Sequence, residues 1–117
     1  MKARRPYVAL TLDLATDTTQ NLLALINAAL GDNAECPGAA REVDIQSTAG
    51  NTASIYIGDA SVSPTNYGYE LAAGSGGGVG ASRTYRAGGA NMVAVGELYV
   101  RVNNVASQKL SVEIMAA

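Results

Sequence analysis

The sequence contains no histidine, no tryptophan and no phenylalanine, and it has one cysteine among 117 residues. Without histidine the chain cannot build a Ser-His or Cys-His relay or an ordinary zinc site. A lone cysteine forms neither an internal disulfide bond nor a CxxC redox pair. We therefore expect no enzyme, with no catalytic residue, no cofactor and no metal site.

Charged residues are also scarce, at 15% of the chain and a net charge of −2. An average soluble domain carries about 25% charged residues, and nucleic-acid-binding domains are usually basic. We expect no nucleic acid and no small-molecule substrate as partner. A weakly charged surface of small residues favours a protein that is covered by its neighbours.

Long hydrophobic runs are missing, because Thr11, Asp13 and Asp17 interrupt the first apolar stretch. A secretion signal needs a continuous apolar region, and a membrane span needs about 20 apolar residues. The sequence thus predicts synthesis in the cytoplasm and no membrane partner. Its length favours a single domain over residues 1–117, beginning with a basic arm over residues 1–6.

Most of the chain has the pattern of β-strands. Apolar residues alternate with polar ones over 8–14, 43–45, 53–58, 67–71, 98–102 and 110–114, with a weaker strand over 83–86. Turn residues separate these runs, and the second and third are expected to pair as a hairpin around the turn at 47–51. Short strands at such spacing predict an antiparallel β-sandwich or barrel.

One helix is expected over residues of about 18–30. Asp17 and Gln20 have the spacing of a capping box, and Gly31 supplies a stop. The face opposite the leucines holds Asn21, Ala24, Asn27 and Ala28, without a charge. Solvent-facing helices usually carry Lys and Glu, so this is either an ordinary amphipathic helix or one whose outer face is covered by another chain.

A glycine-rich loop over residues 72–90 is the most conspicuous motif, and it includes Gly76, Gly77 and Gly78. A phosphate-binding loop would need a helix after the glycines and usually a lysine, and neither follows here. Tight bending, or close packing against another chain, explains the glycines better. Cys36, between Glu35 and Pro37, is interpreted as structural because an acidic neighbour does not activate a thiol.

Arg83, Tyr85 and Arg86 form a small basic and aromatic cluster after this loop. Such residues stack on bases in nucleic-acid-binding proteins, but they are also enriched at protein interfaces. We predict protein contacts here. Arg4 and Arg5 of the arm, the uncharged helix face and the glycine-rich loop complete the predicted interface.

The segment from Asn51 to Gly74, NTASIYIGDASVSPTNYGYELAAG, resembles small β-rich virion proteins of tailed bacteriophages. In these proteins a strand of the form xIYIGxxxV precedes xxxxGYxLxxG, and strands like 97–102 and 110–114 follow. The resemblance covers the second half to two-thirds of the chain and leaves the helix outside. It implies a jelly-roll-like β-sandwich bound to a capsid, often as a dimer or trimer.

From this resemblance and the composition we predict a structural virion protein located on the capsid surface. It would be a decoration, or cement, subunit that bridges and stabilises neighbouring major capsid proteins, with that protein and copies of itself as partners. Two alternatives stay open: a fibre module that binds a receptor or glycan, and the coat protein of a simple shell.

Overall fold

The computed structural model describes residues 3–74, 78–88 and 91–116. Within them the chain is mainly β, with antiparallel sheets and one α-helix. The elements in chain order are β1 (Ala3–Arg4), β2 (Tyr7–Asp13), β3 (Gln20–Asn21), α1 (Leu22–Leu30), β4 (Ala34–Glu35), β5 (Ala39–Ser47), β6 (Ile55–Gly58), β7 (Tyr69–Leu71), β8 (Ser82–Arg86), β9 (Val93–Ala94), the 3-10 helix η1 (Val95–Glu97), β10 (Tyr99–Arg101) and β11 (Lys109–Ala116).

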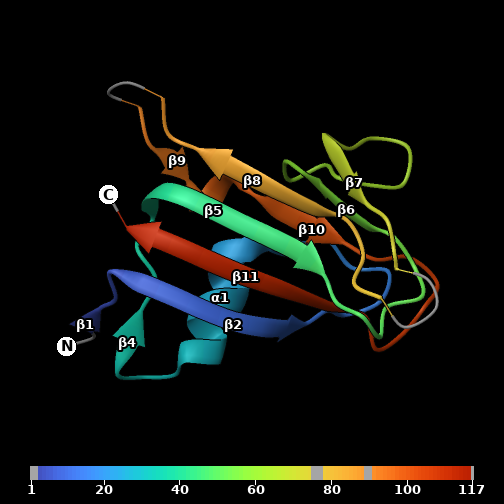
Figure 1. The fold of residues 1–117 in the computed structure, drawn as a ribbon, viewed down its shortest axis with the longest axis horizontal. Coiled ribbons are helices and arrows are strands. Elements are labelled where there is room, and N and C mark those ends of the chain that lie inside the picture. The colour runs from blue at the N-terminus through green and yellow to red at the C-terminus, as the bar shows by residue number, and fades with distance from the viewer. Residues whose placement is uncertain (1–2, 75–77, 89–90, 117) are drawn as a thin grey trace.

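The larger sheet has five strands, and Figure 1 shows its four long strands side by side. Their order is β2-β11-β5-β8, and β9 pairs with the beginning of β5. All of these pairs are antiparallel. Although β2 and β11 lie near opposite ends of the sequence, they pair over their whole length, from Tyr7 with Met115 to Asp13 with Lys109.

The second sheet has four strands in the order β3-β10-β6-β7, again with antiparallel neighbours. A short parallel pair joins β1 to β4, so residues 3 and 4 of the predicted arm belong to a strand. In Figure 1 α1 crosses behind β11 and β2. The helix therefore covers part of the inner face of the larger sheet.

One hydrophobic core joins the inner faces of both sheets and α1. Alternate residues of each strand enter it, as expected for sheets with one buried face. Its largest fully buried members are Leu22, Ile26, Val43, Ile45, Ile55, Ile57, Leu71, Val95, Val100, Val102, Leu110 and Ile114. Their volume is aliphatic throughout, because the chain has no phenylalanine or tryptophan.

The helix is shorter than predicted, and the predicted capping box is wrong. Helix α1 begins at Leu22, and its cap is Asn21, whose side-chain oxygen accepts a hydrogen bond from Ala24 N at 2.9 Å. Gln20 instead accepts a bond from Ala15 N, and Asp17 accepts one from Asn104 N. Pairing of β3 with β10 keeps residues 20–21 extended, so tertiary contacts overrode a good local signal.

The predicted hairpin between residues 43–45 and 53–58 is also wrong. β5 pairs with β11, β8 and β9, whereas β6 pairs with β10 and β7 in the other sheet. The turn after Ser47 therefore carries the chain from one sheet to the other. Alternation predicts that a strand exists and which face is buried, but it does not choose the partner strand.

The predicted glycine-rich loop over residues 72–90 is interrupted by β8. At its two glycines nearest the sheets, a side chain would collide with backbone. A Cβ on Gly74 would lie 1.9 Å from Gly78 O, and one on Gly80 would lie 2.3 Å from Ala72 O. These two glycines are therefore required for close packing within the chain itself.

Candidate functional site

The basic and aromatic cluster predicted from the sequence lies on β8, which is an edge strand of the larger sheet. Tyr85 is half-buried, while Arg83 and Arg86 are exposed. Arg83 and Tyr85 pair with Ile45 and Val43, so they lie on the same side of the sheet as those core residues. Arg86 lies on the opposite, outer side.

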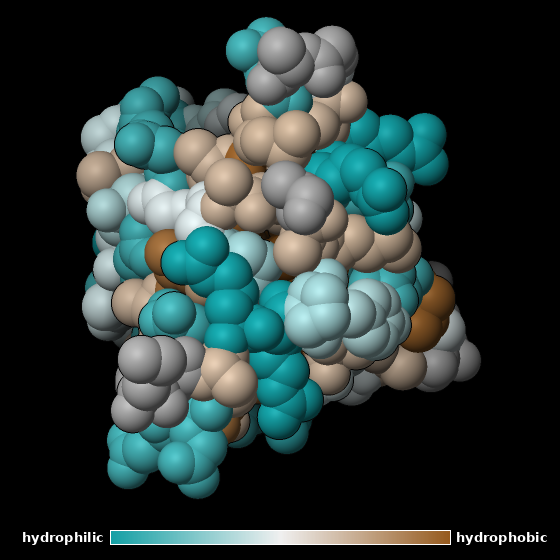
Figure 2. Space-filling model, turned by 90° about the vertical axis from the view of Figure 1, so that its left-hand side faces the viewer, coloured by the Kyte–Doolittle hydropathy of each residue, from teal (hydrophilic) through white to brown (hydrophobic). Residues whose placement is uncertain are grey.

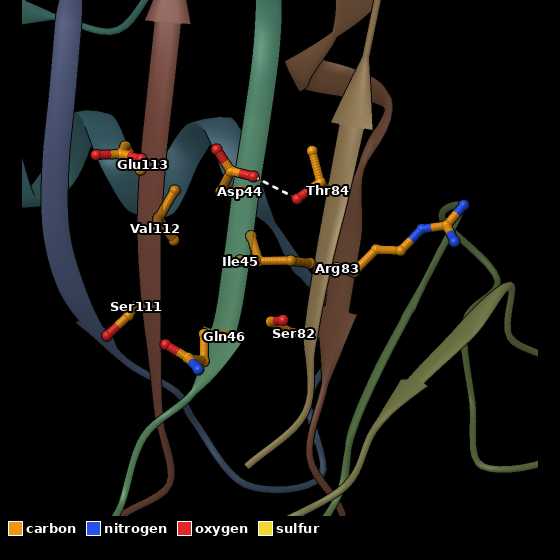
Figure 3. A pocket seen from close by; sticks show the side chains of 9 residues that line it. All are labelled: Asp44, Ile45, Gln46, Ser82, Arg83, Thr84, Ser111, Val112 and Glu113. Carbon is orange, nitrogen blue, oxygen red and sulfur yellow. Dashed lines mark hydrogen bonds between the residues drawn. The ribbon is translucent and has the colours of Figure 1, made fainter. Parts of the chain in front are cut away.

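Arg83 is held by two tyrosine rings. Its guanidinium carbon is 5.0 Å from the ring centroid of Tyr69 on β7 and 5.1 Å from that of Tyr85. Figure 3 shows the side chain reaching from β8 away from β5. Burial raises the pKa of Tyr85, although the nearby Arg83 acts in the opposite direction. A cation between two ring faces links the edges of the two sheets.

The outer face of the larger sheet has a shallow hollow of about 290 Å³ over β11, β5 and β8 (Figure 3). Small polar side chains surround it, and at one side Arg86 Nε contacts Glu42 Oε1 at 2.9 Å. The residues that line it are Asp44, Ile45, Gln46, Ser82, Arg83, Thr84, Ser111, Val112 and Glu113. The hollow is open and polar, which suits contact with another surface better than enclosure of a small ligand.

Two carboxylates oppose each other at the centre of this face. Asp44 on β5 is the register partner of Glu113 on β11. Thr84 donates a hydrogen bond to Asp44, and Tyr7 donates one to Glu113. The bond to Glu113 raises the pKa of Tyr7. Like charges placed directly opposite each other destabilise a sheet, and this pair was not found by sequence reasoning because it depends on strand register.

The remaining predicted interface residues do not form one surface with β8. Arg4 is in β1 and, like Arg5, is exposed; the backbone N–H of Arg5 donates to Glu35 O at 3.0 Å. Gly78 of the glycine-rich loop is exposed, whereas Gly76 and Gly77 lie outside the described residues. The structure therefore places the predicted interface on several separate parts of the molecule.

The uncharged helix face is only partly an outer face. Ala24 and Ala28 are exposed, as predicted. Asn21 and Asn27 are half-buried and bind within the chain: Asn21 Nδ2 donates to Gly96 O at 2.8 Å, and Asn27 Oδ1 accepts from Cys36 N at 2.7 Å. These two asparagines therefore have structural roles, which corrects their prediction as outward-facing contacts.

Cys36 is buried, and burial raises the pKa of its thiol to about 11. A thiol with such a pKa is almost fully protonated at neutral pH and is a poor nucleophile. Its environment agrees with the structural role expected from the sequence.

Sequence reasoning did not place an aromatic surface on the outer side of the smaller sheet. Tyr56 on β6 and Tyr67 in the following loop lie with ring centroids 5.0 Å apart. Tyr67 is 44% exposed, and it borders a second hollow with Gly58, Asp59, Asn66 and Gly68. The neighbouring Glu70 carboxylate raises the pKa of Tyr67. The sequence motif GYxL lies next to Tyr67, but no local pattern predicts that the two rings meet.

Figure 2 shows the end of the molecule that lies on the left in Figure 1. Hydrophilic patches alternate there with weakly hydrophobic ones, and strongly hydrophobic colour is confined to small spots. Across residues 3–74, 78–88 and 91–116, no helix combines the length and apolar character that a bilayer span requires. In the same residues no three His, Cys, Asp or Glu side chains are grouped as metal ligands.

Comparison of the sequence with protein-family models, with curated proteins and with solved structures gave no match.

Proposed function

We propose that this chain is a structural virion protein, a decoration subunit that binds the outside of a capsid and bridges neighbouring coat subunits. The observation that carries the proposal is the pairing of the strands. The eight strands of the two sheets, leaving out β9, can be numbered 1 to 8 in chain order. The first then pairs with the eighth, the second with the seventh, the third with the sixth and the fourth with the fifth.

This nested order is that of one long antiparallel hairpin wound into two facing sheets. We infer that the fold is a jelly-roll β-sandwich, with α1 inserted between the second and third strands. Jelly rolls recur in viral capsid proteins and in lectins. Because one fold serves many functions, the fold supports the proposal by analogy, and the evidence for binding has to come from the surface.

The surface supports a role in protein contacts in two ways. The outer face of the larger sheet has a shallow, open hollow lined mainly by polar residues, and Asp44 and Glu113 lie opposite each other in it. A basic side chain of a coat subunit would neutralise both carboxylates, which favours binding of a partner at this face. We propose that this face contacts the capsid and that the chain acts without catalysis, metal or cofactor.

The test compares particles made with and without this chain during heating or in urea. Particles that lack the chain should release their genome at a lower temperature, and added purified protein should restore the original value. Ser111→Trp, which fills the hollow, should bind empty shells at least about tenfold more weakly, a loss of roughly 1.4 kcal/mol. Thr18→Trp, on an exposed loop, is the matched control.

Equal genome release with and without bound protein would refute the stabilising role. Binding that Ser111→Trp leaves unchanged would refute the assignment of this face. Assembly of closed shells by the purified chain alone would instead identify a coat protein.

A glycan-binding module is the second candidate, and the exposed Tyr67 ring favours it. Aromatic rings pack against the apolar faces of sugars, and polar groups of Asp59 and Asn66 border the adjacent hollow. Saturation-transfer NMR with a panel of neutral monosaccharides and disaccharides tests this candidate. Binding that is lost in Tyr67→Ala and kept in Tyr7→Ala would support it, and the absence of any transfer would refute it.

A further inference from the structure

The free edge of β8 offers unpaired backbone groups to another strand. Ser47 N donates to Ala81 O at 3.0 Å, and Ala87 N donates to Arg41 O at 2.8 Å. These two hydrogen bonds to β5 lie just before and just after β8, so they fix which residues of β8 bond to β5. In an antiparallel pair, backbone groups point alternately toward the partner strand and away from it. Arg83 and Tyr85 therefore bond to β5, while Ser82, Thr84 and Arg86 direct their N–H and C=O groups outward.

These three residues are exposed, and no other described strand pairs with β8. The opposite edge of the sheet is β2, which contacts α1. Figure 1 shows the C-terminal end of α1 emerging beyond β2, close to β4. Covering an edge with other elements is one way in which proteins prevent pairing between molecules.

We propose that β8 pairs antiparallel with β8 of a second copy of this chain, with Thr84 opposite Thr84 of the partner subunit. This register matches Ser82 with Arg86 of the partner subunit and uses all three outward residues of each copy. It provides roughly six backbone hydrogen bonds. The result is a two-fold symmetric dimer with one sheet continuous across both copies.

The side chains of β8 favour a second copy in this register, because no two like charges are then placed opposite each other. With Thr84 on the two-fold axis, Arg83 lies opposite Tyr85 of the partner subunit, so the two Arg83 side chains are kept apart. Moving the axis to residue 83 would place Arg83 opposite Arg83 of the partner subunit, and like charges at such positions repel. Moving it to residue 85 would place Ser82 opposite Gly88 of the partner subunit, beyond the end of β8.

A charge on the inner side of an edge strand usually discourages pairing. In this chain Arg83 already rests on the rings of Tyr69 and Tyr85, which keeps its guanidinium beside its own molecule. Arg86 is likewise held by Glu42 on the outer face. Both arginines therefore leave the backbone of β8 accessible.

The sequence predicted copies of this chain as partners, and the inference rests on that prediction and not on the contact with the capsid. It is tested on purified full-length protein without capsids, so its failure is separate from failure of the capsid role. Sedimentation equilibrium should show a mass of twice 11.9 kDa that falls on dilution. In the dimer, the amides of Ser82, Thr84 and Arg86 should exchange slowly with deuterium, and in the monomer they should exchange rapidly.

A cysteine pair tests the register. Thr84→Cys places two thiols across the axis, with Cα atoms roughly 5.5 Å apart, within the range for a disulfide. It should cross-link rapidly under mild oxidation, while Ala9→Cys on β2, also exposed, should not. Peptide mapping distinguishes these bridges from any bridge to the buried Cys36.

Thr84→Pro removes an N–H that points away from β5 and should weaken the dimer at least about tenfold. Thr84→Val keeps that N–H and should remain dimeric. A monomer at every concentration would overturn the proposal. So would cross-linking of Thr84→Cys no faster than that of Ala9→Cys, or rapid exchange of the three amides in a dimer.

Discussion

Asn51 offers the sharpest test of how the turn after β5 is held to the first residue of β11. It is 3% exposed, and its Nδ2 donates to Lys109 O at 2.7 Å and to Ser47 Oγ at 2.8 Å. Its Oδ1 accepts from Lys109 N at 2.7 Å. The side chain thus satisfies the backbone of Lys109 at the first residue of β11, just after a loop.

Asn51→Ala leaves both backbone groups of Lys109 without their partner. Each buried group that loses its hydrogen bond costs about 1–3 kcal/mol, and entry of water into the small cavity offsets part of this. We expect a loss of about 3 kcal/mol in the free energy of unfolding. An unfolding entropy of about 2.1 cal/mol/K per residue gives about 0.25 kcal/mol/K for 117 residues, so Tm should fall by about 12 °C.

Differential scanning calorimetry and urea unfolding measure this loss. The matched control is Asn66→Ala, because Asn66 is exposed and donates to Ser61 O and Oγ at 3.2 and 2.8 Å. It should cost less than about 0.5 kcal/mol, as surface substitutions usually do. A Tm for Asn51→Ala within about 3 °C of the unsubstituted protein would refute the reasoning, since that corresponds to less than 1 kcal/mol.

Asn51→Asp adds a pH-dependent test. The carboxylate can accept from Lys109 N but cannot donate to Lys109 O, so burial should raise its pKa above the value of about 3.9 in the unfolded chain. Stability relative to the unsubstituted protein should be highest below that pH and should fall as the pH rises through the raised pKa. A penalty equal at pH 3 and pH 7 would contradict this assignment.

Three further predictions concern other parts of the fold. Gly80→Ala, whose Cβ would lie 2.3 Å from a backbone oxygen, should destabilise the chain by about 1–3 kcal/mol, while Gly50→Ala, with open space, should be harmless in the same urea unfolding experiment. Burial raises the pKa of the Cys36 thiol to about 11, so between pH 9 and 11 the thiol ionises in the unfolded chain but not in the folded one, and the free energy of unfolding declines. Cys36→Ala should flatten this decline. Parallel curves of stability against pH for the two proteins would contradict the prediction. Glu113→Gln removes the like charge opposite Asp44 and should raise the free energy of unfolding by about 0.2–1 kcal/mol, with a smaller gain in high salt. A loss of stability would show that the Glu113 charge stabilises the fold.

Alternation in the sequence was sufficient to locate most of the strands. The run from Val8 to Leu14 corresponds to β2, and the run from Leu110 to Ile114 lies within β11. In both, the buried residues are those that the pattern selected, because a strand with one covered face must place alternate side chains inward. The stop at Gly31 is likewise confirmed, with a positive φ of 81°.

The start of the helix shows where local reasoning fails. Asp17 and Gln20 match a capping box, yet Asn21 is the cap, since pairing of Gln20 and Asn21 with β10 delays the helix. The partner residues, Tyr99 and Val100, are almost eighty positions away in the chain. A local motif contains no information on such a distant competitor.

The candidate interaction surface was likewise predicted in part from the sequence and decided in part by the tertiary structure. Arg83, Tyr85 and Arg86 were predicted as contacts from their residue types. Pairing of β8 with β5 decides which side of β8 faces the core, and the approach of β7 to β8 brings Arg83 onto Tyr69.

Composition and alternation by themselves determined that this chain is mainly β, that its core is aliphatic and that histidine chemistry is impossible, because these properties belong to single residues and to their immediate spacing. Only the tertiary structure decided which strands pair, where Asp44 meets Glu113 and which strands lie at the edges of the sheet. Pairing between distant strands depends on the sum of many contacts across the whole core, and no short segment of sequence contains that sum.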